Sequence, residues 1–169
     1  MALTLGVAFV VAHRVYDLRG PAVQPSVAAP LTDAQSRQQV LETARQFVSA
    51  GELGAANGTY FLATCTADEQ PPYKGTIDLN FDLPTIAETP AYFRKIALAM
   101  KARGWREGLP PVHHPGGFTL AKDGVVAVYY RHLDVPRRGV LEIDGECRNV
   151  TDHQSDTTGF IDITGQLYG

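Results

Sequence analysis

Residues 139–149 read Gly-Val-Leu-Glu-Ile-Asp-Gly-Glu-Cys-Arg-Asn, and their alternation decides the expected fold. Leu141, Ile143, Gly145 and Cys147 fall on one side of an extended chain, and the four residues at the positions between and after them are charged. A period of two is typical of a half-buried strand with one face in water. The stretch therefore predicts a strand that points Cys147 toward the core, and we expect the rest of the chain to cover that face.

The composition of the chain is that of one globular domain. It has 169 residues, of which 44% are hydrophobic and 20% charged, a length and balance sufficient for a single core. The net charge of -3 provides no basic field for nucleic acid, so we expect no nucleic-acid partner. The two cysteines lie 82 positions apart, without a CxxC or a zinc-type Cys/His spacing. In an exported protein such a pair indicates one disulfide, and in a cytosolic protein two buried thiols.

The N-terminus favours export. Residues 2–12 are an apolar run that is shorter than the roughly 20 residues of a membrane-spanning helix and matches the apolar core of a signal peptide. No Lys or Arg precedes the run, so a start further upstream is one hypothesis. We interpret residues 1–19 as a signal-like or membrane-anchor segment; the alternative is an apolar helix packed on the domain. Residues 20–30 contain three prolines and no charge, which predicts an extended linker. Residues 31–169 would then form a single extracytoplasmic domain.

Periodicity and turn residues predict the elements of this domain. Thr32 and Gln35 form a capping box at the start of a helix over 32–50. Thr89 as N-cap and Pro90 at the first position begin a second helix, which ends before Gly104. After a loop at 51–58, strands are expected at 59–65, 73–82, 118–122, 125–132 and 139–149, with a short edge strand at 160–163. This order predicts an α+β fold, in which both helices cover one face of an antiparallel sheet of about five strands.

The two cysteines are expected on the buried face of this sheet. Phe61, Ala63 and Cys65 would share that face on one strand, and Cys147 would lie on it at the end of another. A disulfide between Cys65 and Cys147 would join an early strand to a late one and would stabilise the fold by roughly 4 kcal/mol. Two separate buried thiols remain the alternative.

Chemical motifs are few. His113 and His114 are adjacent in a proline-rich loop and lack metal-site spacing, and His132 and His153 are isolated. Five carboxylates are expected on one solvent-exposed sheet face, where they would keep the surface soluble: Asp78, Asp82, Glu142, Asp144 and Glu146. The sequence has no GxSxG, GxGxxG or P-loop motif. We therefore predict no catalytic, cofactor or metal site.

Four runs carry a resemblance to a known group of proteins. They are Pro71-Pro72-Tyr73-Lys74-Gly75, Ala102-Arg103-Gly104-Trp105, the hairpin at 119–125 and the run Gly145-Glu146-Cys147-Arg148-Asn149 with its continuation to His153. Together they resemble small exported proteins and lipoproteins of actinobacteria, mycobacteria especially, over roughly residues 30–169. The resemblance implies a cell-envelope location and one disulfide, but no activity. The sequence departs from the lipoprotein members because no cysteine precedes Cys65.

Three functions are compatible with these features. The first is a non-catalytic envelope domain, tethered to the membrane through its N-terminal segment, that binds a protein or lipid partner. The second is a carrier of a small ligand or lipid with a cavity between helices and sheet. The third is a hydrolase or metal enzyme, for which carboxylates or histidines would have to converge in a cleft. We favour the first.

Overall fold

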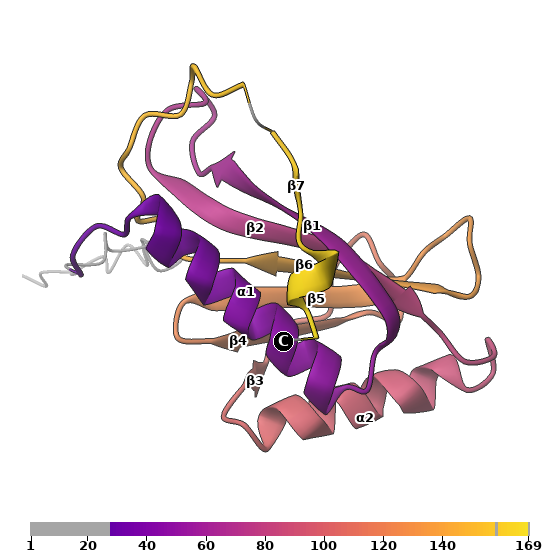
Figure 1. The fold of residues 1–169 in the computed structure, drawn as a ribbon. Helices are drawn as coiled ribbons and strands as arrows, with labels where there is room; N and C mark the ends of the chain where they lie inside the picture. Colours follow the sequence, from indigo (N-terminus) through magenta and orange to yellow (C-terminus); the bar gives the residue numbers. More distant parts are fainter. Residues whose placement is uncertain (1–27, 158, 169) are drawn as a thin grey trace, which may run out of the picture.

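The computed structural model describes residues 28–157 and 159–168 of the chain. The expected anchor at 1–19 lies outside the described residues, and so does the expected linker up to residue 27. The elements follow in the order α1 (Asp33–Ala50), β1 (Gly54–Thr64), β2 (Tyr73–Asp82), α2 (Thr89–Lys101), β3 (Arg106–Glu107), β4 (Phe118–Lys122), β5 (Val125–Arg131), β6 (Arg138–Asp144), β7 (Ile161–Asp162) and a short 3-10 helix, η1 (Thr164–Gln166) (Figure 1).

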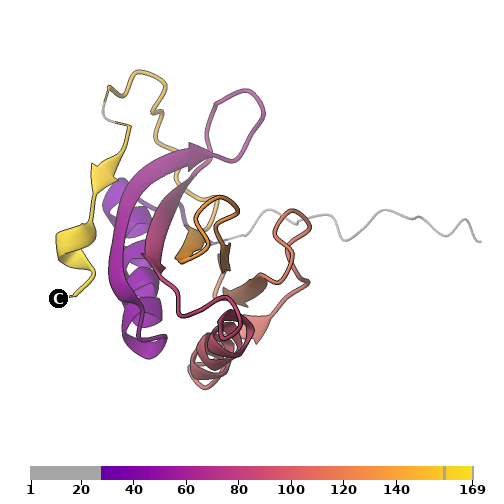
Figure 2. The same ribbon diagram turned by 90° about the vertical axis from the view of Figure 1, so that its right-hand side faces the viewer.

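The strands of the described residues form one sheet in the order β3-β4-β5-β6-β2-β1-β7. Every neighbouring pair is antiparallel. β6 holds the central place, between β5 and β2, and so joins the β1–β2 hairpin to the β4–β5 hairpin. Both helices pack on one face of this sheet (Figure 2). The expected α+β fold is confirmed, with seven strands in place of about five.

α1 begins at the predicted capping box. The Gln35 N–H donates to Thr32 Oγ1 at 3.2 Å, and the Thr32 N–H donates to Gln35 Oε1 at 2.9 Å. The helix buries a stripe that includes Val40, Ala44 and Phe47 against the sheet. It crosses β2 where Gly75 has no side chain: a Cβ there would lie 2.5 Å from the main-chain oxygen of Ser36. The missing side chain therefore lets the helix approach the strand closely.

α2 differs from the prediction at its start. The structure places Glu88 at the N-cap and Thr89 inside the helix, where the Thr89 hydroxyl donates to the carbonyl oxygen of Thr85 at 3.0 Å and caps nothing. Gly104 ends the segment as expected, with a positive φ of 87°, and Trp105 folds back into the core. Among the described residues, neither helix combines the length and apolarity needed to cross a bilayer.

The strands also differ from the prediction, most clearly at β1, β3 and β6. β1 begins at Gly54 inside the expected loop, because the chain pairs Gly54 with Asp82 and absorbs one extra residue in a bulge before Asn57. β3 was not predicted; it has two residues and pairs with β4. β6 ends at Asp144, five residues earlier than predicted, and the chain then turns, with the Arg148 N–H donating to the carbonyl oxygen of Glu146 at 2.9 Å.

The pairing of β1 with β2 sets which side chains of β1 face the helices. Tyr60 lies opposite Ile77 and Phe61 opposite Thr76. Directly paired residues of antiparallel strands point to the same face, so Tyr60 and Leu62 face the helices and Phe61 faces away. The prediction that Phe61, Ala63 and Cys65 share the buried face is therefore wrong.

Candidate functional site

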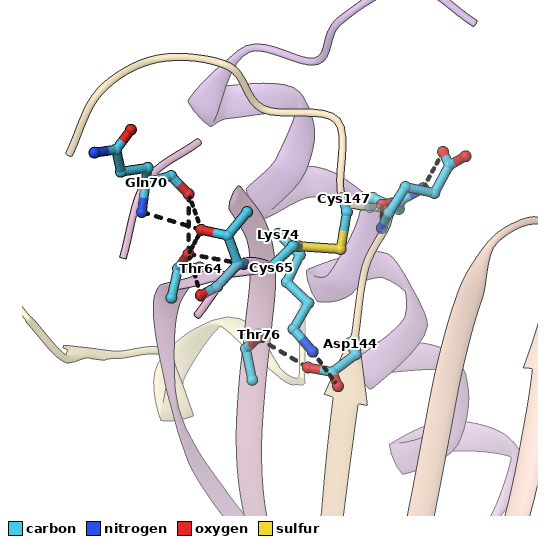
Figure 3. Close-up of a disulfide and its surroundings, with 10 residues drawn as sticks. Thr64, Cys65, Gln70, Lys74, Thr76, Asp144 and Cys147 are labelled. Atoms are coloured by element: carbon cyan, nitrogen blue, oxygen red, sulfur yellow. Dashed lines mark hydrogen bonds and ion pairs between the residues drawn. A yellow bond between two sulfur atoms is a disulfide. The ribbon is translucent and has the colours of Figure 1, made fainter. Parts of the chain in front are cut away.

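The disulfide lies at one end of the sheet. The sulfur atoms of Cys65 and Cys147 are 2.03 Å apart and the Cα atoms 6.0 Å apart (Figure 3). Cys65 is half-buried and Cys147 is exposed, which contradicts the prediction that both face the core. Cys65 continues the positions of β1 that point away from the helices, after Phe61 and Ala63, because its N–H still bonds to the Pro72 carbonyl. Cys147 lies three residues beyond the end of β6, so the alternation of that strand does not reach it. The bond joins the chain after β1 to the chain after β6.

The expected carboxylate face is present in part. Asp78 and Glu142 lie opposite each other on β2 and β6, on the sheet face away from the helices. Next to them Asp144 binds Lys74 at 2.6 Å and accepts the Thr76 hydroxyl at 2.9 Å (Figure 3). Burial, then the charges of Glu142 and Asp144, raise the pKa of Asp78 above its ordinary value. Glu142 accepts the Tyr130 hydroxyl at 2.5 Å, and all three carboxylates are half-buried, whereas the prediction places them on a solvent-exposed face.

The other two expected carboxylates do not belong to this group. Asp82 is exposed at the end of β2. Glu146 lies beyond β6 and accepts bonds from Gln39 of α1 at 3.0 Å and from Arg148 at 2.8 Å, so it stands on the helix side. Its predicted position on the open face is wrong, because β6 ends before it.

Three of the histidines considered from the sequence occupy separate positions. The His114 ring stacks on Tyr130 with 3.5 Å between centroids, whereas His113 is exposed. His132 Nδ1 accepts the main-chain N–H of Asp134 at 3.1 Å. Within residues 28–157 and 159–168, no group of three or more His, Cys, Asp or Glu side chains is arranged to hold a metal ion.

A hollow between α1, the edge of β1 and the C-terminal segment is the candidate binding site. It has a volume of about 460 Å³, and we call it the β1 groove. The residues that line it come from α1 (Asp33, Ala34 and Arg37), from β1 (Tyr60, Phe61 and Leu62), from β2 (Tyr73) and from the C-terminal segment (His153, Asp156, Gly159 and Ile161). The C-terminal segment, yellow in Figure 1, returns beside β1 after a loop and closes this side of the groove.

His153 connects the two walls of the groove. Its Nε2 lies 3.2 Å from Asp33 Oδ1 at the start of α1, and its Nδ1 lies 2.7 Å from Asp156 Oδ2. The buried Asn149 amide donates to the same Asp33 oxygen at 2.7 Å, and the His153 ring packs edge-on against Tyr73. Both imidazole nitrogens are thus engaged by carboxylates. The network fixes the C-terminal segment to α1.

Arg37 and Tyr60 carry unused hydrogen-bonding capacity in the groove. The Arg37 guanidinium lies over the Tyr60 ring, 5.6 Å from its centroid, and Nη2 donates to Gln166 Oε1 at 3.2 Å. Arg37 Nε and Tyr60 Oη are buried and have no partner. Burial, and next the charge of Asp33, raise the pKa of Tyr60 to about 12, against a smaller opposing effect of Arg37. The hydroxyl therefore stays protonated near neutral pH and can donate to a bound group.

A second hollow continues the groove past His153. Its volume is about 350 Å³, and it shares Leu62, Tyr73 and His153 with the first. Its other lining residues include Asp68 and Glu69 of the loop after β1. The two hollows together form an elongated surface along the end of β1, beside the disulfide.

Sequence reasoning missed this site. It treated His153 as isolated and considered Asp33 only as part of a helix start, and 120 positions separate these two residues. The alternation of β1 was assigned to the wrong phase, so Tyr60 was placed on the solvent face. Assigning the even positions of β1 to the buried face would have identified Tyr60 as a residue of the site.

Comparison with known proteins gives one family. A family model described as "Putative lipoprotein LppJ" matches residues 32–166. Proteins described as "Putative lipoprotein LppJ" from Mycobacterium tuberculosis (strain ATCC 25618 / H37Rv) and from Mycobacterium bovis (strain ATCC BAA-935 / AF2122/97) are each 42% identical over 142 residues. Each alignment covers 83% of this chain and 73% of the relative. No solved structure matches the chain significantly.

Proposed function

The chain belongs to the LppJ family, and from this premise we propose that it is a non-catalytic, extracytoplasmic binding domain tethered to the membrane of the cell envelope. In this proposal residues 1–19 are the targeting or anchoring segment, residues 20–30 the linker and residues 31–169 the domain. The domain binds its partner in the β1 groove. The description of the relatives as lipoproteins supports the location, and the geometry of the groove supports the binding.

One observation supports the choice of the β1 groove as the binding site. Arg37 Nε and Tyr60 Oη are buried there without partners. An unmade hydrogen bond at a buried polar group costs about 1–3 kcal/mol, so such groups are rare unless they serve a purpose. A partner that supplies acceptors to both groups would recover this cost on binding. The groove is thus a place where a ligand would gain from polar contacts.

The geometry of His153 favours binding over catalysis. A general base needs a free nitrogen within reach of the substrate proton. In His153 the two ring nitrogens already face Asp33 and Asp156, so the carboxylate–histidine group holds the groove together and does not present a base to it.

The groove lies at the tethered end of the domain. The Leu31 N–H donates to the Arg148 carbonyl at 2.9 Å, and the Arg148 side chain donates to the Ala29 carbonyl at 3.0 Å. These bonds hold the described start of the chain beside Cys147. Asp33, two residues further on, lines the groove. A partner in the groove would therefore be bound close to the point where the linker joins the domain.

Site-specific photo-crosslinking in the full chain tests the proposal. A photo-crosslinking amino acid replaces Ala34, which is exposed on α1 at the groove, and in a matched variant it replaces Leu98, which is exposed on α2. Both variants are produced in a mycobacterial host and irradiated in intact cells. We expect the protein in the envelope fraction, digestible by protease added outside, with a crosslinked product from position 34 and none from position 98.

Two results would contradict this proposal separately. A chain found only in the cytosol and protected from protease would overturn the location. An envelope protein that forms equal products from positions 34 and 98, or none, would overturn the groove as the binding site. A lipid adduct at position 34 would favour a lipid partner, and a protein adduct a protein partner.

A further inference from the structure

Resting on the proposed function, we propose that the β1 groove binds an extended peptide segment with basic side chains, which adds as a strand to the open edge of β1 at Leu62–Thr64. The edge is open because β7 is short. β7 pairs with β1 only at Thr59–Asp162 and Tyr60–Ile161. Among the described residues, no strand pairs with Leu62, Ala63 or Thr64 on that side.

The direction of the main chain shows which groups are available. The Ile163 N–H donates to the Gly58 carbonyl, whereas the Cys65 N–H donates to the Pro72 carbonyl on the side of β2. Main-chain groups alternate sides along a strand, so the even positions of β1 point away from β2. Leu62 and Thr64 therefore direct their N–H and C=O groups toward the groove. An unpaired edge of this kind is a template for an added strand.

The side chains of the groove favour a peptide over a purely apolar ligand. The unpartnered Arg37 Nε is a donor, and Tyr60 Oη stays protonated. Both need acceptors, and every peptide unit carries a carbonyl oxygen. A hydrocarbon chain would leave both groups unsatisfied. An extended peptide can supply carbonyls to them and to the β1 edge at the same time.

The charges of the residues that line the groove indicate which kind of peptide it binds. Asp33 and Asp156 line the groove and Asp68 and Glu69 line its continuation, whereas Arg37 is the only Lys or Arg among the described lining residues. Complementary charge steers association and excludes partners of the same sign. The side chains of the added strand that lie over these acids are therefore basic.

Synthetic peptides and amide hydrogen exchange of the full chain in detergent test the inference. The probe is a ten-residue peptide in which Lys alternates with Val or Thr; its matched control carries Glu in place of Lys. We expect the Lys peptide to bind at least tenfold more tightly than the Glu peptide. On binding, the exchange of the Leu62 and Thr64 amides should slow at least tenfold. The Phe61 and Ala63 amides already pair with β2, so their exchange should change little.

Changes in the peptide and in the protein distinguish strand addition from charge attraction alone. N-methylation at every second residue removes half of the peptide N–H groups. One of the two possible alternate sets should weaken binding at least tenfold and the other less than threefold, because only one set faces β1. Asp68→Asn with Glu69→Gln should weaken the Lys peptide several-fold, and Asp123→Asn at the distant β4–β5 turn should not.

Three outcomes would overturn the inference. Equal effects of the two N-methylated sets, or unprotected Leu62 and Thr64 amides in the bound state, would show that the peptide does not extend the sheet. A neutral hexasaccharide that shifts the NMR signals of Arg37 and Tyr60 while no peptide does would replace the peptide by a glycan and leave the proposed function standing. If no probe shifts these signals and position 34 forms no crosslink, both the inference and the proposed function are wrong.

Discussion

Tyr60 and Tyr129 are two buried tyrosines on the helix side of the sheet, and they differ in the partner of the hydroxyl group. The Tyr129 hydroxyl donates to the Phe93 carbonyl at 3.1 Å, whereas Tyr60 Oη has no partner. Burial raises the pKa of both. The first hydroxyl therefore contributes to stability, and the second is available to a ligand at a cost to the free protein.

This difference predicts opposite effects of the same substitution. Tyr129→Phe removes the buried bond from the Tyr129 hydroxyl to the Phe93 carbonyl and should lower the free energy of unfolding by about 1–2 kcal/mol. Tyr60→Phe removes a group that is already unpaired and should leave that free energy unchanged or raise it by up to about 1 kcal/mol. Urea unfolding of both variants measures this. A loss at Tyr60→Phe as large as at Tyr129→Phe would mean that the Tyr60 hydroxyl is bonded in the free protein.

Asp78 predicts a dependence of stability on pH. Because its pKa is raised in the folded state, the folded protein holds this proton more tightly than the unfolded chain. The resulting contribution to the free energy of unfolding is fully present below the ordinary pKa of an aspartate. It is lost as the pH rises through the pKa that Asp78 has in the folded state. Asp78→Asn cannot ionise, so at pH 7 it should be more stable than the wild type, and the difference should shrink toward about pH 4.

Urea unfolding of wild type and Asp78→Asn at pH 7 and pH 4 measures this dependence. Asp82→Asn, exposed on the same strand, is the control and should show no such trend. A variant Asp78→Asn that is less stable than the wild type at pH 7 would show that the charged carboxylate is favourable there.

At the scale of the elements, α1 was predicted almost to the residue and β1 was not. Thr32 and Gln35 are neighbours in sequence, and their bonds depend on local geometry alone. The same holds for the Asp123–Gly124 turn, where both residues adopt the positive φ that a tight hairpin requires. The start and the phase of β1 depend on its pairing with β2, and tertiary contacts of this kind override the weak strand preference of residues 54–58.

The crossing of α1 over the sheet depends on Gly75. A side chain at this position would meet the main chain of Ser36 at 2.5 Å, and the helix would have to move away from β2. Gly75→Ala should therefore destabilise the fold by about 1–3 kcal/mol, as overpacking does. Gly165→Ala is the matched control, because a Cβ at Gly165 has no neighbour within 4 Å.

Thermal or urea unfolding of the two glycine variants compares them directly. The free energy of unfolding of Gly165→Ala should stay within about 0.5 kcal/mol of the wild-type value. Equal stability of Gly75→Ala and the wild type would mean that α1 can shift over β2 at little cost, and that the close approach is not required for the fold.

At the scale of the whole molecule, the sequence supported the family and the fold class but not the groove. The resemblance to mycobacterial exported or lipoprotein-like proteins is confirmed by the match over residues 32–166. The groove brings together Asp33, Tyr60 and His153, which are far apart in the chain. Their proximity follows from the return of the C-terminal segment to β1, where two residue pairs form the ladder. A contact so short leaves almost no periodic pattern in the sequence.

The disulfide likewise joins residues that are far apart in the chain. A bond between Cys65 and Cys147 closes a loop across 82 positions, and it joins the ends of β1 and β6, which are separated in the sheet by β2. In the chain-entropy account, closing a loop of this length restricts the unfolded chain by roughly 4 kcal/mol. Such bonds persist in oxidising compartments, which agrees with the proposed location in the cell envelope. The bond should therefore matter to the stability of the whole domain and little to its local packing, since Cys147 is exposed.

We expect the double variant Cys65→Ser, Cys147→Ser to keep the fold and to lose up to roughly 4 kcal/mol of the free energy of unfolding. Urea unfolding with and without dithiothreitol measures this. The reductant should lower the free energy of unfolding of the wild type toward that of the variant, and it should leave the value of the variant unchanged. Peptide mapping without reduction should recover residues 65 and 147 in one linked fragment. Two free thiols in protein isolated from the envelope would refute the bond, and with it this argument for an oxidising location, because stability would then come from the packed sheet and helices alone.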